Sequence, residues 1–293
     1  EELGGDALVT ARLVREAQSA AQLRHPAIVS VHEVSERNGQ PYIVSDFIEG
    51  PTLAAEIERR SFSTDEAAAV VARLADALDY AHACGVVHRD VKPGNVLLPA
   101  PGRPVLTDFG LAQLARAEIG LTRQGDVLGT PAYMAPEQAR GDVDQVDART
   151  DVYALGAMLY ELMTGRRPFA GASAASVLYA VVHRDPEPAG AVKDGLPGDL
   201  VTICGKAMAR EPARRYARAR DLADDLRRFL AREPIAARPP GLLRRAALWV
   251  RRNPALAATL AVSAAVLVGV TAVGLAPVLD ARHVEDERGE DAL

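Results

Sequence analysis

Apolar residues recur every three or four positions between residues 67 and 81, a spacing that places them on one face of a helix. A capping-box pattern, Ser63 to Glu66, comes directly before them, and Gly85 follows. We therefore expect a helix between these limits. Similar patterns predict four further helices, at 151–163, 174–183, 199–210 and 219–232.

A run of β-branched and aromatic residues at 41–48 predicts a strand. The turn dipeptide Asn38-Gly39 precedes it, so we expect this strand to pair in a hairpin with a strand that begins near 28–34. Strands are few and helices are many. The expected fold class is α+β, with a small sheet beside a large helical body.

Residues 253–279 form a stretch of 27 residues without a charge, of which 19 are Ala, Val or Leu. About 20 apolar residues span a bilayer, and a buried core helix rarely runs so long without an ionisable group. The stretch therefore predicts a single transmembrane helix. Ala261, Ala265 and Gly269 lie at helical spacing within it and could pack two spans in a homodimer, although alanine is abundant here.

The flanks of this stretch predict its orientation. Residues 232–252 carry six arginines against one glutamate, whereas 280–293 carry six acidic and two basic residues. Cytoplasmic flanks are rich in arginine, so we expect a cytoplasmic domain at 1–232 on the cell membrane. A Pro- and Arg-rich linker at 233–252 would follow it, and 280–293 would start an extracytoplasmic segment.

Composition narrows the function classes. With 48% hydrophobic and 25% charged residues the chain is of ordinary globular composition, and its net charge of −5 gives no general attraction to nucleic acid. Nucleic-acid binding is therefore not expected. The two cysteines, Cys84 and Cys204, have no metal-ligand spacing, and we expect both to be small buried residues in a reducing compartment.

Candidate chemistry lies between residues 87 and 137. The sequence HRDVKPGN at 88–95 follows the first predicted helix, and DFG at 108–110 begins 13 residues after Asn95. Carboxylates and an amide on neighbouring loops could hold Mg²⁺, which prefers oxygen ligands together with substrate phosphates. With APE at 135–137, the order and spacing of the three motifs fit the protein-kinase pattern.

Over residues 8–232 the chain resembles the Ser/Thr protein kinases, and most closely the bacterial membrane-anchored kinases of the PknB-like kind. Residues 15–29 are similar to the family's helix C and the strand after it, and 151–169 also fit. The resemblance implies a two-lobe kinase fold with an incomplete N-lobe. It also implies transfer of the γ-phosphate of ATP, with Mg²⁺, to serine and threonine of protein substrates in transmembrane signalling.

The resemblance further implies roles in catalysis. Asp90 would accept the proton of the substrate hydroxyl, while Asn95 and Asp108 would hold Mg²⁺. A lysine at position 92 of this loop is typical of Ser/Thr kinases, and Lys92 would add positive charge beside the phosphoryl group. Thr130 would brace Asp90 and Lys92.

Other residues would bind the nucleotide, again as the resemblance implies. The backbone from Asp46 to Ile48 would pair with adenine, and Leu97 would form the floor under the ring. Ser45 would be a small gatekeeper that leaves the back pocket open. Glu16 would pair with an ATP-binding lysine, or could be only a solvated charge on helix C.

Regulation and architecture complete the set. Thr122, at a position phosphorylated in related kinases, would pair with Arg89 once phosphorylated. Glu137 and Arg215 would form a buried ion pair without a catalytic duty. Asp151 would anchor the catalytic loop from below, or could merely cap its helix.

The sequence departs from the family at its start. Residues 1–91 contain no lysine, and no G-x-G-x-x-G loop is present, although kinases use both to bind phosphates. Two explanations of this difference stay open. The sequence is a truncated part of an ordinary kinase, or the protein is a pseudokinase that acts as a membrane scaffold. The intact base and metal ligands favour truncation. The chain as printed is then expected to transfer phosphate poorly.

Overall fold

The structure is a computed structural model that describes residues 21–37, 40–109 and 131–237. The chain divides into two compact units, Glu1–Pro239 and Pro240–Leu293, and all the described residues belong to the first. The predicted transmembrane helix at 253–279 therefore lies outside the described residues, as does most of the predicted linker. Among the helices that are described, none combines the length and apolar character needed to cross a bilayer.

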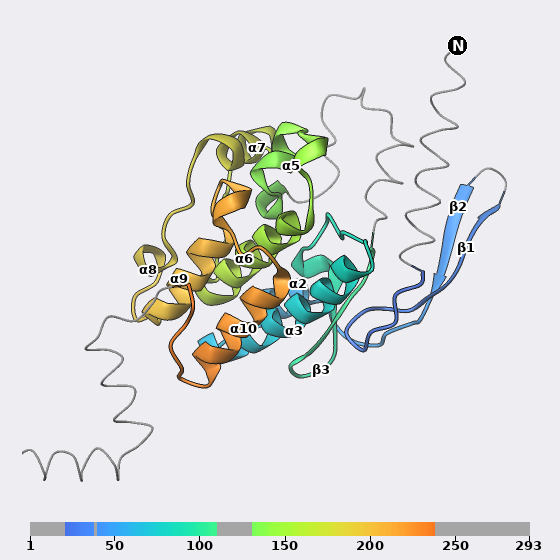
Figure 1. Cartoon of the computed structure of the whole chain (residues 1–293), viewed down its shortest axis with the longest axis horizontal. Coiled ribbons are helices and arrows are strands. Elements are labelled where there is room, and N and C mark those ends of the chain that lie inside the picture. Colours follow the sequence, from blue (N-terminus) through green and yellow to red (C-terminus); the bar gives the residue numbers. More distant parts are fainter. Residues whose placement is uncertain (1–20, 38–39, 110–130, 238–293) are drawn as a thin grey trace, which may run out of the picture. The chain divides into compact units, whose positions relative to one another are not determined.

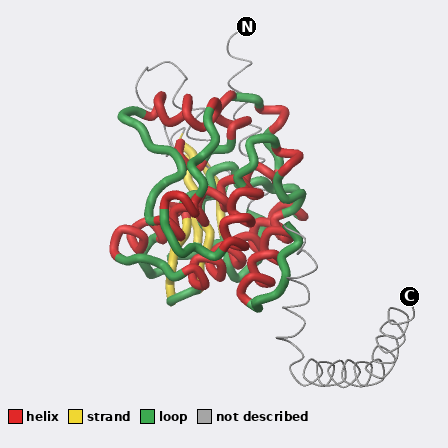
Figure 2. Tube along the Cα trace, turned by 90° about the vertical axis from the view of Figure 1, so that its left-hand side faces the viewer, coloured by secondary structure: helices red, strands yellow, loops and turns green. Residues whose placement is uncertain are grey.

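The described residues form short strands and a larger set of helices, which Figures 1 and 2 show. In chain order these are β1 (Val31–Arg37), β2 (Gln40–Ser45), α2 (Leu53–Arg59), α3 (Thr64–Ala83), β3 (Val96–Ala100), β4 (Arg103–Leu106), α5 (Pro136–Arg140), α6 (Ala148–Thr164), α7 (Ala174–His183), α8 (Ala189–Val192), α9 (Gly198–Ala207) and α10 (Ala219–Leu230).

Helix α3 packs against both α6 and α10 and forms the centre of the helical body (Figure 1). The predicted capping box starts α3: the Ser63 hydroxyl accepts from the Glu66 amide, and the Ser63 amide donates to the Glu66 carboxylate. Helix α6 is buried without a break from Thr150 to Met163. Gly156 lets α9 approach α6, because a Cβ there would lie 2.8 Å from the side chains of Ala207 and Met208.

The strands form two antiparallel pairs, β1 with β2 and β3 with β4. The segment after β2 crosses β3, where the Leu98 amide donates to the Pro51 carbonyl at 2.9 Å. Gly50 makes this crossing: its φ is 151°, and a Cβ there would lie 2.6 Å from the Leu98 carbonyl oxygen. The crossing places Pro51 and Thr52 against β3, the strand that directly follows the catalytic loop.

The five helices predicted between residues 63 and 232 are all present, and the α7 bounds agree with the expected 174–183. Most of the expected helix C lies outside the described residues. The hairpin is also present, and its first strand begins at Val31, within the expected range 28–34. Ahead of this strand, Ile28 forms a parallel bridge to Leu106, and the Val29 amide donates to the Leu106 carbonyl at 2.9 Å. The residues just before β1 thus join β4, a contact that the sequence did not predict.

One cysteine prediction is wrong. Cys84 is exposed at the C-terminal cap of α3, where the helix has already reached the surface. Cys204 is buried as expected, and burial raises the pKa of its thiol to about 12. Only Cys204 behaves as a small core residue.

Candidate active site

The catalytic-loop candidates gather around the Asp90 carboxylate. Its Oδ2 accepts from the Lys92 ammonium at 2.7 Å and from the Asn95 amide at 3.0 Å. The Asn95 amide also donates to the Asp90 carbonyl at 2.9 Å. The structure therefore brings these three residues together, with the Asp90 and Lys92 side chains only about a quarter exposed.

His88 fixes the loop from inside. Its ring is fully buried, its Nε2 donates to the Thr107 carbonyl at 2.9 Å, and its Nδ1 accepts from the Asp90 amide at 3.3 Å. A carbonyl can only accept, so this pair of contacts places the proton on Nε2. The His88 imidazole thereby links the loop that carries Asp90 to the segment that carries Asp108.

Asp151 holds the same loop from α6. Its carboxylate accepts from the backbone amides of His88 and Arg89, at 2.9 and 2.8 Å. It also contacts His82 Nε2 at 2.7 Å. The N-cap of α6 is a different residue, Asp147, so the contacts of Asp151 are those of a loop anchor.

Two residues of the site have positive φ, Arg89 at 66° and Asp108 at 63°. Non-glycine residues rarely adopt this region, and it costs about 1 to 3 kcal/mol each. Surrounding bonds hold the first of these conformations, because the Arg89 amide is bound by Asp151 and its carbonyl accepts from Gln138 at 2.7 Å. Such strain is typical of sites where side-chain direction matters more than stability.

Asn95 and Asp108 lie on adjoining segments, joined where the Thr107 amide donates to the Asn95 carbonyl at 3.0 Å. The Asn95 amide nitrogen is used on Asp90, which leaves its side-chain oxygen for a cation. The Asp108 carboxylate is exposed. Amide and carboxylate oxygens are the ligands that Mg²⁺ prefers, so these two residues fit the expected ion. No cluster of three or more His, Cys, Asp or Glu side chains suited to a metal exists in the described part of the chain.

The nucleotide-binding candidates lie near β3. Leu97 is half-buried and forms an antiparallel bridge to Thr52, the last residue of the crossing segment that contains Asp46 and Ile48. Ser45 is exposed at the end of β2. The Asp46 carboxylate contacts His32 Nε2 at 2.6 Å, and this hydrogen bond lowers the pKa of Asp46.

Glu137 and Arg215 form a buried, bidentate ion pair, with distances of 2.7 and 2.8 Å between guanidinium and carboxylate atoms. Burial alone would raise the pKa of Glu137, but the hydrogen bonds and charge of Arg215 hold it below its usual value. Thr150 of α6 adds a further hydrogen bond at 2.9 Å. The pair ties the start of α5 to the segment before α10.

Two residues that help to hold the catalytic loop were not predicted from the sequence. His82 contacts the anchor, Asp151, and Gln138 donates to the Arg89 carbonyl of the loop. No local pattern marks either residue, since their partners lie 69 and 49 positions away. Three predicted residues, Glu16, Thr122 and Thr130, lie outside the described residues.

This geometry agrees with the comparison to known proteins. The chain belongs to the protein kinase domain family, which matches residues 5–224. Among its relatives are proteins named serine/threonine-protein kinase PknB. The one from Mycobacterium tuberculosis (strain H37Rv) is 42% identical over 229 residues, and the one from Mycobacterium leprae is 40% identical over 228; each alignment covers 76% of this chain.

A probable serine/threonine-protein kinase PknB of Bifidobacterium longum is 38% identical over 248 residues, which cover 80% of this chain. The matched part is 36% of the length of each of these three relatives. The kinase domain is thus shared with them, whereas most of their length has no counterpart in this comparison.

Proposed function

We propose that this chain carries the catalytic domain of a membrane-anchored serine/threonine protein kinase. It would transfer the γ-phosphate of ATP to serine and threonine hydroxyls of proteins. The observation that carries the proposal is the Asp90 carboxylate, held by Lys92 and Asn95 beside the segment that bears Asp108. Phosphoryl transfer requires a base, a positively charged group and oxygen ligands for Mg²⁺ at one site. Asp90 would be the base, Lys92 the positive charge, and Asn95 and Asp108 the ligands.

The contacts suggest how the proton moves. Lys92 and Asn95 both contact Oδ2 of Asp90, so we assign Oδ1 to accept the proton of the substrate hydroxyl. The hydroxyl oxygen then forms its bond to the γ-phosphorus as the bond to the ADP oxygen breaks. The Lys92 ammonium, 2.7 Å from the carboxylate, would stand beside the developing negative charge.

Mg²⁺, when bound, neutralises charge on the phosphates, and Asn95 and Asp108 are the described residues that would hold it. The backbone from Asp46 to Ile48, with Leu97, would hold the adenine. Bracing by Thr130, pairing of Glu16 with a lysine and phosphorylation of Thr122 near Arg89 remain parts of the proposal. The pseudokinase alternative gains no support from the described residues, because Asp90 and Asn95 are in contact and Asp108 lies on the adjoining segment.

An assay of phosphate transfer tests the proposal. Transfer from ATP and Mg²⁺ to serine, threonine and tyrosine peptides is measured for the protein and for Asp90→Asn. Loss of a positioned base should lower kcat by about 10² to 10⁴-fold, with nucleotide affinity kept. The control Asp185→Asn alters an exposed carboxylate and should keep the rate. Equal rates in both variants, or transfer to tyrosine alone, would reject the proposal.

The membrane placement has its own test. The arginines at 232–252 and the uncharged stretch at 253–279 suggest a single span with the kinase domain in the cytoplasm. A reporter fused after Leu293 should then be active only outside the cytoplasm. Cytoplasmic reporter activity would reject this topology without affecting the catalytic proposal.

A further inference from the structure

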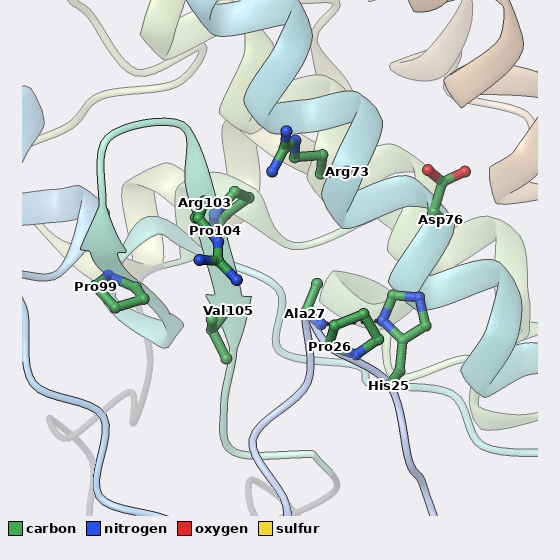
Figure 3. A pocket seen from close by; sticks show the side chains of 9 residues that line it. All are labelled: His25, Pro26, Ala27, Arg73, Asp76, Pro99, Arg103, Pro104 and Val105. Atoms are coloured by element: carbon green, nitrogen blue, oxygen red, sulfur yellow. Dashed lines mark hydrogen bonds between the residues drawn. The ribbon is translucent and has the colours of Figure 1, made fainter.

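A cavity of about 300 Å³ lies between α3, the β3–β4 hairpin and the segment before β1 (Figure 3). Its lining residues are His25, Pro26, Ala27, Arg73, Asp76, Pro99, Arg103, Pro104 and Val105. None of them belongs to the catalytic loop or carries a role in the proposed phosphoryl transfer. A volume of this size is at the lower end for small-molecule sites.

Two guanidinium groups in this cavity, those of Arg73 and Arg103, have no carboxylate partner among the described residues. Figure 3 shows Arg73 reaching from α3 toward the hairpin, on the side where Arg103 lies. Neither side chain makes a hydrogen bond or ion pair with another described residue. An anion bound between them would offset their two like charges, and their planar guanidinium groups match carboxylate and phosphate oxygens.

Asp76 supplies the one carboxylate among the lining residues, and it does not balance the charge of the two arginines. Asp76 is bound by Arg227 of α10, so its charge is already balanced. Figure 3 shows Asp76 and His25 at the opposite end of the cavity from Arg103. The end between Arg73 and Arg103 therefore keeps its positive charge.

His25 adds a donor at the far end. Its Nδ1 accepts from the Ala27 amide at 3.2 Å, which places the proton of the neutral ring on Nε2. Burial lowers the pKa of His25 despite the nearby charge of Asp76, so the ring is neutral at pH 7. Stacking on Tyr80, with ring centroids 5.4 Å apart, fixes its orientation.

The walls between the two ends are formed by apolar residues. Three prolines, Ala27 and Val105 line them, and proline has no backbone N–H. Such walls suit a hydrocarbon body better than a hydrated ion. We propose that this cavity binds a small organic anion, with a phosphate or carboxylate group between Arg73 and Arg103 and an apolar body along the proline walls.

The probe is phenyl phosphate, titrated into the full chain by calorimetry at saturating ATP. We expect saturable binding at one site, weaker for inorganic phosphate, which lacks the apolar body. Benzoate distinguishes the two head groups: tighter binding than phenyl phosphate assigns a carboxylate, and weaker binding assigns a phosphate. Absence of saturable binding for all three, or equal affinity for phenyl phosphate and inorganic phosphate, would overturn the proposal.

Variants locate the site. Arg73→Gln and Arg103→Gln should each weaken binding about tenfold or more, as for loss of a charge-assisted hydrogen bond. Arg73→Lys keeps the positive charge but lacks the planar guanidinium group, so its affinity should lie between those of the unmodified protein and Arg73→Gln. The control is Arg184→Gln, an exposed arginine that does not line the cavity. All three positions are exposed, so thermal melting should be unchanged in the four variants. Equal affinity in Arg73→Gln and Arg184→Gln would reject the assignment.

Discussion

Two pairs of side chains in contact represent two regions of this molecule. In the helical body, Glu137 and Arg215 are almost completely buried, with side-chain exposures of 1% and 0%. In the region of β1 and β2, His32 and Asp46 are in contact at 2.6 Å but are 54% and 44% exposed. Burial removes the competing water from the first pair, so each of its partners depends on the other. The exposed pair can exchange its partner for solvent.

The apolar residues of the two regions differ in the same way. Helix α6 is buried along most of its length, whereas Tyr42 and Val44 of β2 are about 40% exposed and Phe47 is 91% exposed. The catalytic loop is held by the buried region, through Asp151 of α6. The comparison therefore indicates that the helical body fixes the position of the catalytic loop.

The largest expected effect is on the buried ion pair. Glu137→Gln removes the charge that balances Arg215 and should lower the free energy of unfolding by about 3 to 5 kcal/mol. Denaturant unfolding measures it. The matched change Asp46→Asn, in the exposed pair, should leave the unfolding curve almost unchanged. Similar losses in both variants would contradict the contrast between the regions.

The second prediction concerns the loop anchor. The backbone amides of His88 and Arg89 donate to different oxygens of Asp151. Asp151→Asn replaces one of these oxygens with an amide donor, so one hydrogen bond is lost and the loop should shift. A misplacement of about 1 Å can cost on the order of 100-fold in rate, and we expect kcat to fall by about that factor in a phosphate-transfer assay.

The control for this prediction is Asp147→Asn. Asp147 caps the same helix and is 46% exposed, and asparagine is an equally good N-cap. Its kcat should be unchanged. If both variants lost activity equally, the effect would belong to the helix and not to the anchor.

The third prediction is a pH dependence. The pKa of Glu137 is lower in the folded state than its ordinary value of 4.5, so its carboxylate contributes stability above pH 4.5. That contribution is lost as the pH falls through the folded-state pKa. The difference in unfolding free energy between the protein and Glu137→Gln should be constant from about pH 7 to 5 and shrink below about 4.5. A difference that stayed constant to lower pH would exclude the linkage.

Sequence patterns predicted the structure well where the interacting residues are close together in the chain, and poorly where they are far apart. The capping box before α3 acts within four residues, and it correctly located the start of that helix. The hairpin was located by its turn residues, whereas the bridge between Ile28 and Leu106 was not predicted, because the two residues lie 78 positions apart in the sequence. The catalytic motifs could be located because each is a short continuous string. His82 and Gln138 could not, since their role arises only when distant segments fold together.

The smallest expected effect is a valine-to-threonine change in β2. Val44 is 42% exposed, so the new hydroxyl stays in water and Val44→Thr should alter the free energy of unfolding by less than about 0.5 kcal/mol. The matched change is Val152→Thr in α6, where the side chain is fully buried. There the hydroxyl loses water and can bond only to a carbonyl of the preceding turn, at a cost of about 1 to 3 kcal/mol. Denaturant unfolding of both variants gives the comparison directly. A loss at Val44 as large as that at Val152 would mean that β2 is packed as tightly as α6, and the distinction between the two regions would fail.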